Sequence, residues 1–279
     1  MEKKRPAVQA VIFICMSLIS LSFLYPLFFM LINSFKTKVL YYTYPFSIPL
    51  ASDAIFENYQ VMIGSFKIFR LFKNTAIIVI VSGVLLTIFA IFASYGFAKL
   101  DFKGKRPIYM GMLATMVIPG QVTMIPMYIM YSKVGLINNH WSVITIYLGT
   151  FVAGNILLMT SFFKGISGEM LEAAKIDGCG YFNTVRNVII PMGIPAIMIN
   201  IIFNAVGMWN DLLTPMIFLT KDKYRTVMPA LANLIQGGQR ASEPTLQMAG
   251  LLLSSLPMIL VYLVFQRYIV KGITMGSIK

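Results

Sequence analysis

The chain has 279 residues, of which 58% are hydrophobic and only 12% charged, with a formal net charge of +13. This composition excludes an ordinary soluble domain and predicts an all-α polytopic membrane protein. The excess of Lys and Arg is expected in loops on the cytoplasmic side, and no basic run interleaved with aromatic residues indicates nucleic-acid binding. Two cysteines and one histidine do not make a zinc site, so we predict no bound metal.

Six apolar runs follow one another along the chain. The first, 11–32, comes after the basic start MEKKRP and is too long for a signal peptide, so we expect a retained span. Five more are each about long enough to cross a bilayer as a helix, at 74–98, 107–131, 142–163, 196–219 and 246–268. We therefore expect one membrane domain over 1–279, with both termini on the same side. The cation-rich loop KLDFKGKRP indicates that this side is cytoplasmic.

The long polar segment 164–195 differs from its apolar flanks. Ser167 is a candidate N-cap with Glu169 in the first turn, and Gly178 stands where a helix ends on a left-handed residue. A second short helix, 181–190, is expected to stop at Pro191. With small side chains on its surface, at Ala173 and Ala174, the segment predicts a compact knob that fits a socket on another protein. An ordinary solvated loop between two spans is the alternative.

The residues of this segment resemble the EAA motif of the membrane subunits of binding-protein-dependent ABC importers. The matching positions are Glu172, Ala173, Ala174, Asp177, Gly178 and Pro191. Further stretches resemble the carbohydrate branch of that family: SYGFAKLDFKGKR, with Ser94 and Lys99 as departures, VIPGQVTMIPMYIMYSKVGLINN, MWNDLLTPMIFL and the tail QRYIVKGITMGSIK. The resemblance runs from about residue 33 to residue 279. Over this length the chain is similar to sugar permeases such as the smaller membrane subunit of the maltose transporter.

This resemblance implies a subunit of a sugar importer in a bacterial or archaeal cytoplasmic (inner) membrane. Its implied partners are a second homologous permease in a heterodimer, a dimer of ABC ATPases on the cytoplasmic side and an extracytoplasmic sugar-binding protein. The EAA residues listed above would couple the spans to the ATPase. The chain has no G-x-x-x-x-G-K-[ST] loop, so ATP and magnesium are expected on the ATPase, and this chain is expected to be neither an enzyme nor a holder of cofactors.

Polar residues inside spans are costly and are therefore candidates for contacts with substrate. A sugar needs hydrogen-bonding groups together with flat apolar or aromatic faces, and the third and fifth spans offer Gln121, Tyr128, Asn200, Asn204, Trp209, Asn210 and Asp211. The alternative role for such amides is to join helices through hydrogen bonds. In the last outer loop, the resemblance implies contact with the binding protein through Gly237, Gly238, Gln239 and Arg240, although a plain flexible loop is equally consistent with the sequence.

Three other functions are alternatives to a sugar importer. An ABC importer for another solute, such as an amino acid or a peptide, would share the EAA motif. A stand-alone secondary transporter needs ion-coupling acids or bases within its spans, and Asp211 is the one candidate, toward the outer end of its run. An intramembrane enzyme needs a nucleophile with a base or a metal cluster, and the sequence shows neither.

Overall fold

The computed structural model describes residues 6–50, 54–236 and 243–276, and every regular element in those ranges is a helix. This confirms the expected all-α architecture. Contacts group the chain into two compact units, which are described separately. The first comprises Met1–Phe69 and Leu231–Pro257, and the second comprises Arg70–Ala230 and Met258–Lys279. The expectation of one membrane domain over the whole chain stays a prediction.

Most of the predicted spans correspond to single long helices. Within the described residues, five helices are long and apolar enough to cross a membrane: Val8–Ser34, Ile68–Lys99, His140–Lys164, Tyr181–Asn210 and Pro244–Gln266. Each overlaps one of the predicted runs. The remaining run, 107–131, is different, because it forms two helical segments, Lys105–Val117 and Gly120–Lys133. Together they are long and apolar enough to cross a membrane, but their axes are bent by 96° relative to each other.

The third predicted span is therefore not one straight helix. The first part consists of α5 (Lys105–Ala114) and the 3₁₀ turn η1 (Thr115–Val117), and α6 (Gly120–Lys133) begins afresh. Between them, Ile118 has extended backbone angles, φ −81° and ψ 115°. Pro119 explains this break, because a proline ring disfavours the helical conformation for the residue before it.

The expectation that the helix beginning at Tyr181 stops at Pro191 is wrong. The helix runs through α9 (Tyr181–Thr184), the π-helical turn η2 (Val185–Ile189) and α10 (Ile190–Asn210). In the π turn, the Ile190 N–H donates to the Val185 carbonyl, five residues back. This wider turn, directly before a proline that has no N–H to donate and whose ring crowds the preceding turn, lets the helix continue.

The fifth predicted span, 196–219, is divided as well. Helix α10 ends at Asn210, and α11 (Leu213–Phe218) is a separate short helix. Asp211 lies between them with extended angles, φ −69° and ψ 125°. Its Oδ1 accepts hydrogen bonds from the backbone N–H groups of Leu213 (3.0 Å) and Thr214 (3.4 Å), which starts the new helix.

The first unit contains α1 (Pro6–Ser34), α2 (Lys38–Thr43), α3 (Glu57–Ile63), most of α12 (Val227–Gln236) and the first part of α13 (Pro244–Gly276). Buried Asn58 joins α3 to the end of α1, because its Nδ2 donates to the carbonyls of Ser34 (2.8 Å) and Lys36 (3.1 Å). The fully buried Lys36 in turn donates from Nζ to the carbonyls of Tyr44 (2.9 Å) and Pro45 (3.1 Å). These bonds hold the turn after α1 in place.

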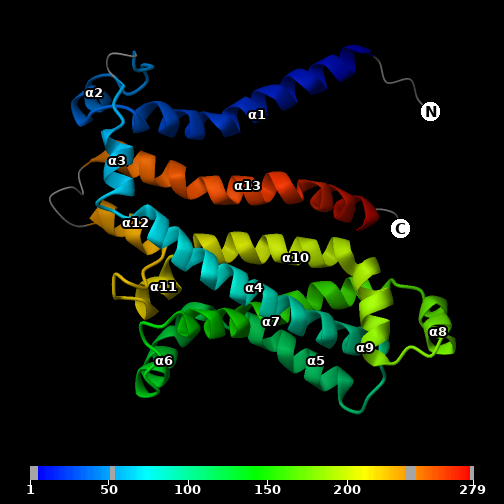
Figure 1. Ribbon diagram of the computed structural model, residues 1–279. Helices are drawn as coiled ribbons and strands as arrows, with labels where there is room; N and C mark the ends of the chain where they lie inside the picture. The colour runs from blue at the N-terminus through cyan, green and yellow to red at the C-terminus, as the bar shows by residue number, and fades with distance from the viewer. Residues whose placement is uncertain (1–5, 51–53, 237–242, 277–279) are drawn as a thin grey trace. The chain divides into compact units, whose positions relative to one another are not determined.

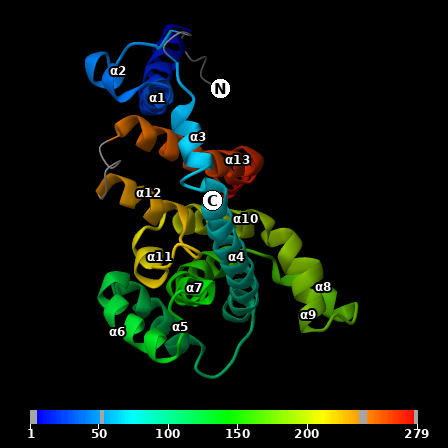
Figure 2. The same cartoon turned by 60° about the vertical axis from the view of Figure 1, so that its left-hand side comes forward.

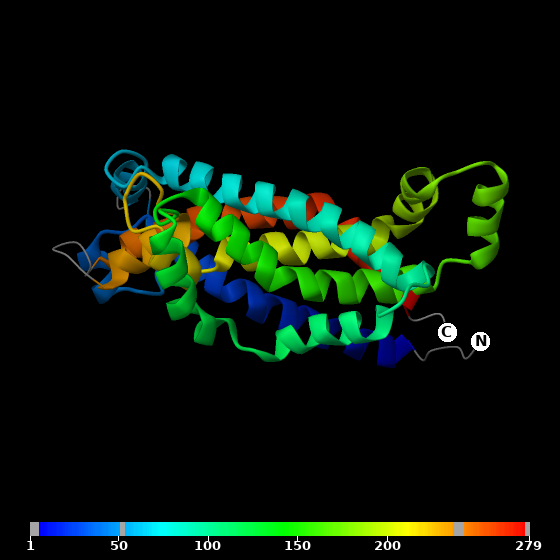
Figure 3. The same cartoon turned by 90° about the horizontal axis from the view of Figure 1, so that it is seen from below.

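The second unit is a helix bundle that contains most of α4 (Ile68–Lys99) together with α7 (His140–Lys164) and α10. Helices α7 and α10 pack along each other, and Ser94 of α4 donates to the Ile156 carbonyl of α7 at 3.2 Å. Helices α8 (Gly168–Ile176) and α9 lie at one end of this unit, and α6 and α11 lie at the other (Figure 1). The rotated views agree on this arrangement (Figures 2 and 3). The unit therefore has α8 and α9 at one end and α6 and α11 at the other.

Candidate functional site: a helical knob and a polar cavity

Helix α8 is closed at both ends by the residues that the sequence indicates. The Ser167 hydroxyl accepts a hydrogen bond from the Glu169 N–H at 3.2 Å, which caps the first turn. At the other end, Gly178 has a φ of +76°, and its N–H donates to the Lys175 carbonyl at 3.0 Å. Only glycine adopts this left-handed geometry without a steric cost. The local prediction for α8 is thus confirmed.

The free face of α8 is partly apolar. Met170, Ala173 and Ile176 are exposed and recur every three residues, so they share one side of the helix, and Ile176 is 86% exposed. Glu172 is exposed as well. Ala174 is not on this face, because it is only 7% exposed, which corrects the expectation that both alanines lie on the surface. Helix α8 packs against α9 and η2.

Aromatic side chains attach the base of this knob to α4. The Tyr181 hydroxyl donates to the Phe92 carbonyl at 3.2 Å, and the Tyr181 ring lies 5.1 Å from the ring of Tyr95. The Phe182 ring lies 5.5 Å from that of Phe92. These contacts link α9, and through it α8, to the end of a long span.

A lysine attaches α4 to the segment that leads into α8. Lys99, the last residue of α4, donates from Nζ to the carbonyls of Lys164 and Ile166, with the first distance 3.1 Å. A cation at this position satisfies carbonyls left free at the end of α7. The side chain therefore joins the end of α4 to the end of α7.

The helices beside the knob approach closely at Gly193. A Cβ placed on Gly193 of α10 would lie 2.6 Å from Cε1 of Phe163, a fully buried side chain of α7.

Pro191, two residues before Gly193, is exposed. The structure thus places the six residues of the EAA resemblance at one end of the second unit. Glu172, Ala173, Asp177 and Gly178 are exposed, Ala174 is buried, and Pro191 lies in the first turn of α10.

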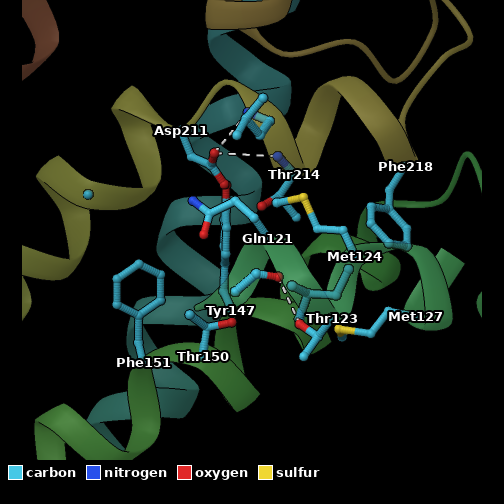
Figure 4. Close-up of a pocket in the computed structure, with 14 residues that line it drawn as sticks. Gln121, Thr123, Met124, Met127, Tyr147, Thr150, Phe151, Asp211, Thr214 and Phe218 are labelled. Atoms are coloured by element: carbon cyan, nitrogen blue, oxygen red, sulfur yellow. Dashed lines mark hydrogen bonds between the residues drawn. The ribbon is translucent and has the colours of Figure 1, made fainter. Parts of the chain in front are cut away.

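A cavity of about 320 Å³ lies toward the end of the unit that holds α6 and α11 (Figure 1), and Figure 4 shows the residues that line it. It is lined by residues of α6, α7, α10 and α11 and of the α10–α11 turn, namely Gly120, Gln121, Thr123, Met124, Met127, Ile146, Tyr147, Thr150, Phe151, Gly207, Asp211, Leu213, Thr214 and Phe218. Its volume is at the lower end of the range for small-ligand sites. The lining mixes hydroxyls, one amide and one carboxylate with aromatic and methionine side chains.

Two of the residues predicted to contact substrate line this cavity, Gln121 and Asp211. Besides starting α11, Asp211 accepts a hydrogen bond at Oδ2 from the hydroxyl of Tyr147, at 3.0 Å. The Tyr147 side chain is buried in α7, so this bond connects the α10–α11 turn to the adjacent span. The predicted candidates Gln121 and Asp211 come together from separate elements, as Figure 4 shows.

The other candidates lie elsewhere. Asn204 is buried and exchanges amide hydrogen bonds with Asn155 of α7, and Asn200 donates to the Asn155 carbonyl at 3.4 Å. Trp209 is buried with its ring 5.9 Å from that of Phe72, Asn210 donates to the Val206 carbonyl of its own helix, and Tyr128 lies 5.9 Å from the Phe218 ring. None of these five is among the described lining residues. Their role in the substrate pathway stays a prediction.

Sequence reasoning missed several residues that α7 contributes. Tyr147, Thr150 and Phe151 line the cavity, and Asn155 forms the amide pair. Thr150 and Phe151 follow Tyr147 by three and four residues, and Asn155 follows Phe151 by four, as neighbours on one helical face do. Asn155 is also a polar side chain within an apolar run, so the rule that singled out Asn200 and Asn204 applies to it equally. The loop residues Gly237, Gly238, Gln239 and Arg240 lie outside the described residues, and their predicted contact stays untested.

A family model described as "Binding-protein-dependent transport system inner membrane component" matches residues 87–275. Among similar proteins, the probable ABC transporter permease protein YurM of Bacillus subtilis is 30% identical over 96% of this chain and 87% of its own length. The probable starch degradation products transport system permease protein AmyC of Thermoanaerobacterium thermosulfurigenes is 30% identical over 94% and 93%. The melibiose/raffinose/stachyose import permease protein MelC of Bacillus subtilis is 28% identical over the full length of both chains.

A solved structure shares this fold. It is a chain of a bacterial ABC transporter involved in the import of the acidic polysaccharide alginate, with a TM-score of 0.79 and 22% identity, covering 96% of this chain and all of that one. A second alginate transporter structure, in complex with an alginate pentasaccharide-bound periplasmic protein, has a TM-score of 0.67 and 13% identity. At these identities the similarity establishes the fold.

Proposed function

Since this chain belongs to the family of inner membrane components of binding-protein-dependent transport systems, we propose that it is a permease subunit of an ATP-driven importer of oligosaccharides. The family match covers most of the chain, and several relatives are sugar permeases by name, including those for starch degradation products and for melibiose, raffinose and stachyose. Its partners are a second homologous permease, a dimer of ABC ATPases and an extracytoplasmic sugar-binding protein. ATP and magnesium bind to the ATPases.

The observation that carries the coupling role is the free face of α8. Met170, Ala173 and Ile176 form an apolar stripe with Glu172 beside it, on a helix that stands at the end of the second unit (Figure 3). An amphipathic helix of this kind fits a groove on a partner. We assign the ATPase as that partner, so α8 is on the cytoplasmic side. With six spans counted along the sequence, both termini are then cytoplasmic as well.

The attachments of α8 supply a mechanism. Closure of the ATPase pair on ATP moves α8, and the contacts of Tyr181 and Lys99 transmit that movement to α4 and α7. Rigid helices that shift against one another can convert such a movement into alternating access. ATP can shift this equilibrium only by its differential affinity for the two states.

The test is co-purification of the tagged chain from its native membranes, followed by identification of its partners by mass spectrometry. Ile176→Asp introduces a charge on the free face, and we expect it to reduce recovery of the ATPase at least tenfold while the second permease is retained. Val39→Asp, at a comparably exposed residue of α2, is the matched control and should leave ATPase recovery unchanged. A chain that purifies alone, or an Ile176→Asp complex that keeps its ATPase, would contradict the proposal.

A further inference from the structure

The cavity lining carries one formal charge. Among the described lining residues, Asp211 is the single acidic side chain, and there is no Lys, Arg or His. A ligand in this cavity therefore meets a negative field from one wall and no compensating cation from the others. At the short distances within such a site, the interaction between two like charges is worth more than it would be in water.

The contacts of Asp211 leave its charge uncompensated. Its three hydrogen-bond donors are the N–H groups of Leu213 and Thr214 and the hydroxyl of Tyr147, all of which are neutral. These bonds hold the carboxylate in one orientation. A carboxylate accepts up to about four hydrogen bonds, so Asp211 can still accept one from a hydroxyl group of a ligand.

The rest of the wall matches an uncharged sugar. The side chains of Gln121 and Thr150 offer donors and acceptors for hydroxyl groups, and Thr123, whose hydroxyl donates to the Gly120 carbonyl at 2.8 Å, offers an acceptor. Phe151 and Phe218 offer rings against which the C–H face of a pyranose can pack, and Met124 and Met127 add adaptable apolar surface. The polar and aromatic residues labelled in Figure 4 come from α6, α7, α11 and the α10–α11 turn, and all of them line this one cavity.

We propose that this cavity is a sugar subsite that accepts uncharged rings and rejects anionic ones such as uronates, with Asp211 as the residue that determines this selectivity. The inference deepens the proposed function and rests on it for the identity of the ligand as a sugar. The charge selectivity of the cavity can be measured separately from transport.

The experiment uses the purified complex of this chain with its partners, with Cys15 and Cys179 replaced by Ser and Thr150→Cys as the reporter inside the cavity. Its labelling rates with a cationic (aminoethyl) and an anionic (sulfonatoethyl) methanethiosulfonate are compared, each normalised to a free thiol. We expect the cation to be favoured by about tenfold, and this preference to disappear with Asp211→Asn. Equal rates, a preference for the anion, or a preference that survives Asp211→Asn would overturn the inference.

Two further variants separate charge from local folding. Asp211→Ser keeps a capping oxygen for α11 and removes the charge, so it should behave as Asp211→Asn does. Tyr147→Phe removes the hydrogen bond to Asp211 and keeps the charge, so the preference for the cationic reagent should remain. If Tyr147→Phe abolished the preference as fully as Asp211→Asn does, the effect would come from local structure, and the assignment to the charge of Asp211 would be wrong.

The sugar is tested by protection of the same reporter. Neutral di- and trisaccharides that the complex transports should slow its labelling, and a matching uronate-bearing disaccharide should not, unless Asp211→Asn is present. If the complex transports neutral sugars that do not slow labelling, the subsite is wrong while the proposed function stands. If the complex transports no sugar in a broad panel, the proposed function fails, and the reagent rates still decide whether the cavity rejects anions.

Discussion

Asn155 of α7 and Asn204 of α10 are joined by two reciprocal hydrogen bonds between their side-chain amides. Asn155 Nδ2 donates to Asn204 Oδ1 at 3.1 Å, and Asn204 Nδ2 donates to Asn155 Oδ1 at 2.8 Å, with both side chains buried. A reciprocal pair forms in only one register of the two helices. The bonds therefore specify how α7 and α10 pack, in addition to adding stability.

Replacing one member should destabilise the helix pair, because the other amide is left buried without its partner. We expect Asn204→Leu to cost about 1–2 kcal/mol in the free energy of unfolding, close to the upper values for interhelical hydrogen bonds in membranes. The double variant Asn155→Leu with Asn204→Leu should recover part of this loss. Thermal unfolding of the purified complex in a double-mutant cycle measures it. A changed sugar dependence with unchanged stability would instead support the predicted role of Asn204 in the substrate pathway.

The close approach at Gly193 predicts an intolerance to any side chain. Gly193→Ala places its Cβ 2.6 Å from the Phe163 ring, and because that ring is fully buried it has little room to move. Overpacking of this kind costs about 1–3 kcal/mol. Gly149→Ala, on an exposed face of α7 where a Cβ meets nothing within 4 Å, is the control and should not destabilise the protein, because alanine is the better helix former. Restoration of stability by Phe163→Leu would identify the ring as the cause, and a stable Gly193→Ala protein would contradict the geometry.

Variants at Gly178 distinguish the effect of backbone strain from the effect of side-chain bulk. A Cβ there meets nothing within 4 Å, so the cost of Gly178→Ala arises from its φ of +76° and should be about 1 kcal/mol. Asn tolerates this conformation better, so Gly178→Asn should be the milder change for the stability of the isolated chain. We expect sugar-stimulated ATPase activity to fall in the order Gly, Asn, Ala if strain alone matters. Equal loss in both variants would show that space beside Gly178 is needed by the ATPase.

Replacing Lys99 should weaken the coupling of transport to ATP hydrolysis while leaving the protein folded. Lys99→Met removes the donor to the carbonyls of Lys164 and Ile166, and it should cost about 1 kcal/mol at this partly exposed position. The segment that leads into α8 is then less firmly attached to α4. We expect less sugar transported per ATP hydrolysed in proteoliposomes. Lys103→Met, at an exposed residue of the following loop, is the control, and equal ratios in the two variants would argue against the attachment.

Lys36 predicts a pH dependence of stability. Burial lowers the pKa of Lys36 below its ordinary value of 10.5. Between the lowered pKa and 10.5 the unfolded chain binds more protons than the folded one, so this residue makes stability rise with pH over that interval. Unfolding midpoints of the wild type should therefore rise relative to those of Lys36→Met as the pH increases toward 10.5. Parallel curves for the two proteins would show that Lys36 titrates normally.

The caps of α8 and the positions of the long spans could be predicted because they depend on neighbouring residues. Ser167 and Gly178 act on N–H and carbonyl groups within a few residues, and the length of an apolar run is a property of the run itself. The continuation past Pro191 was not predicted, because a proline by itself indicates a stop and the π turn that accommodates it involves a bond of unusual spacing. The break at Pro119 was underestimated for the opposite reason, since apolar composition does not distinguish a straight span from a bent one.

The amino-acid sequence by itself determined that this protein is a bundle of apolar helices with a polar knob between two of them, and its motifs were sufficient to indicate the family. Only the tertiary structure decided which polar residues meet. Asn155 and Asn204 are 49 residues apart, and Tyr147 and Asp211 are 64 apart, so their pairing depends on the register in which α7 and α10 pack. The burial of Ala174 follows from packing in the same way. Local sequence specifies bonds within one turn of helix, whereas contacts between helices are specified by the summed packing of many side chains along both.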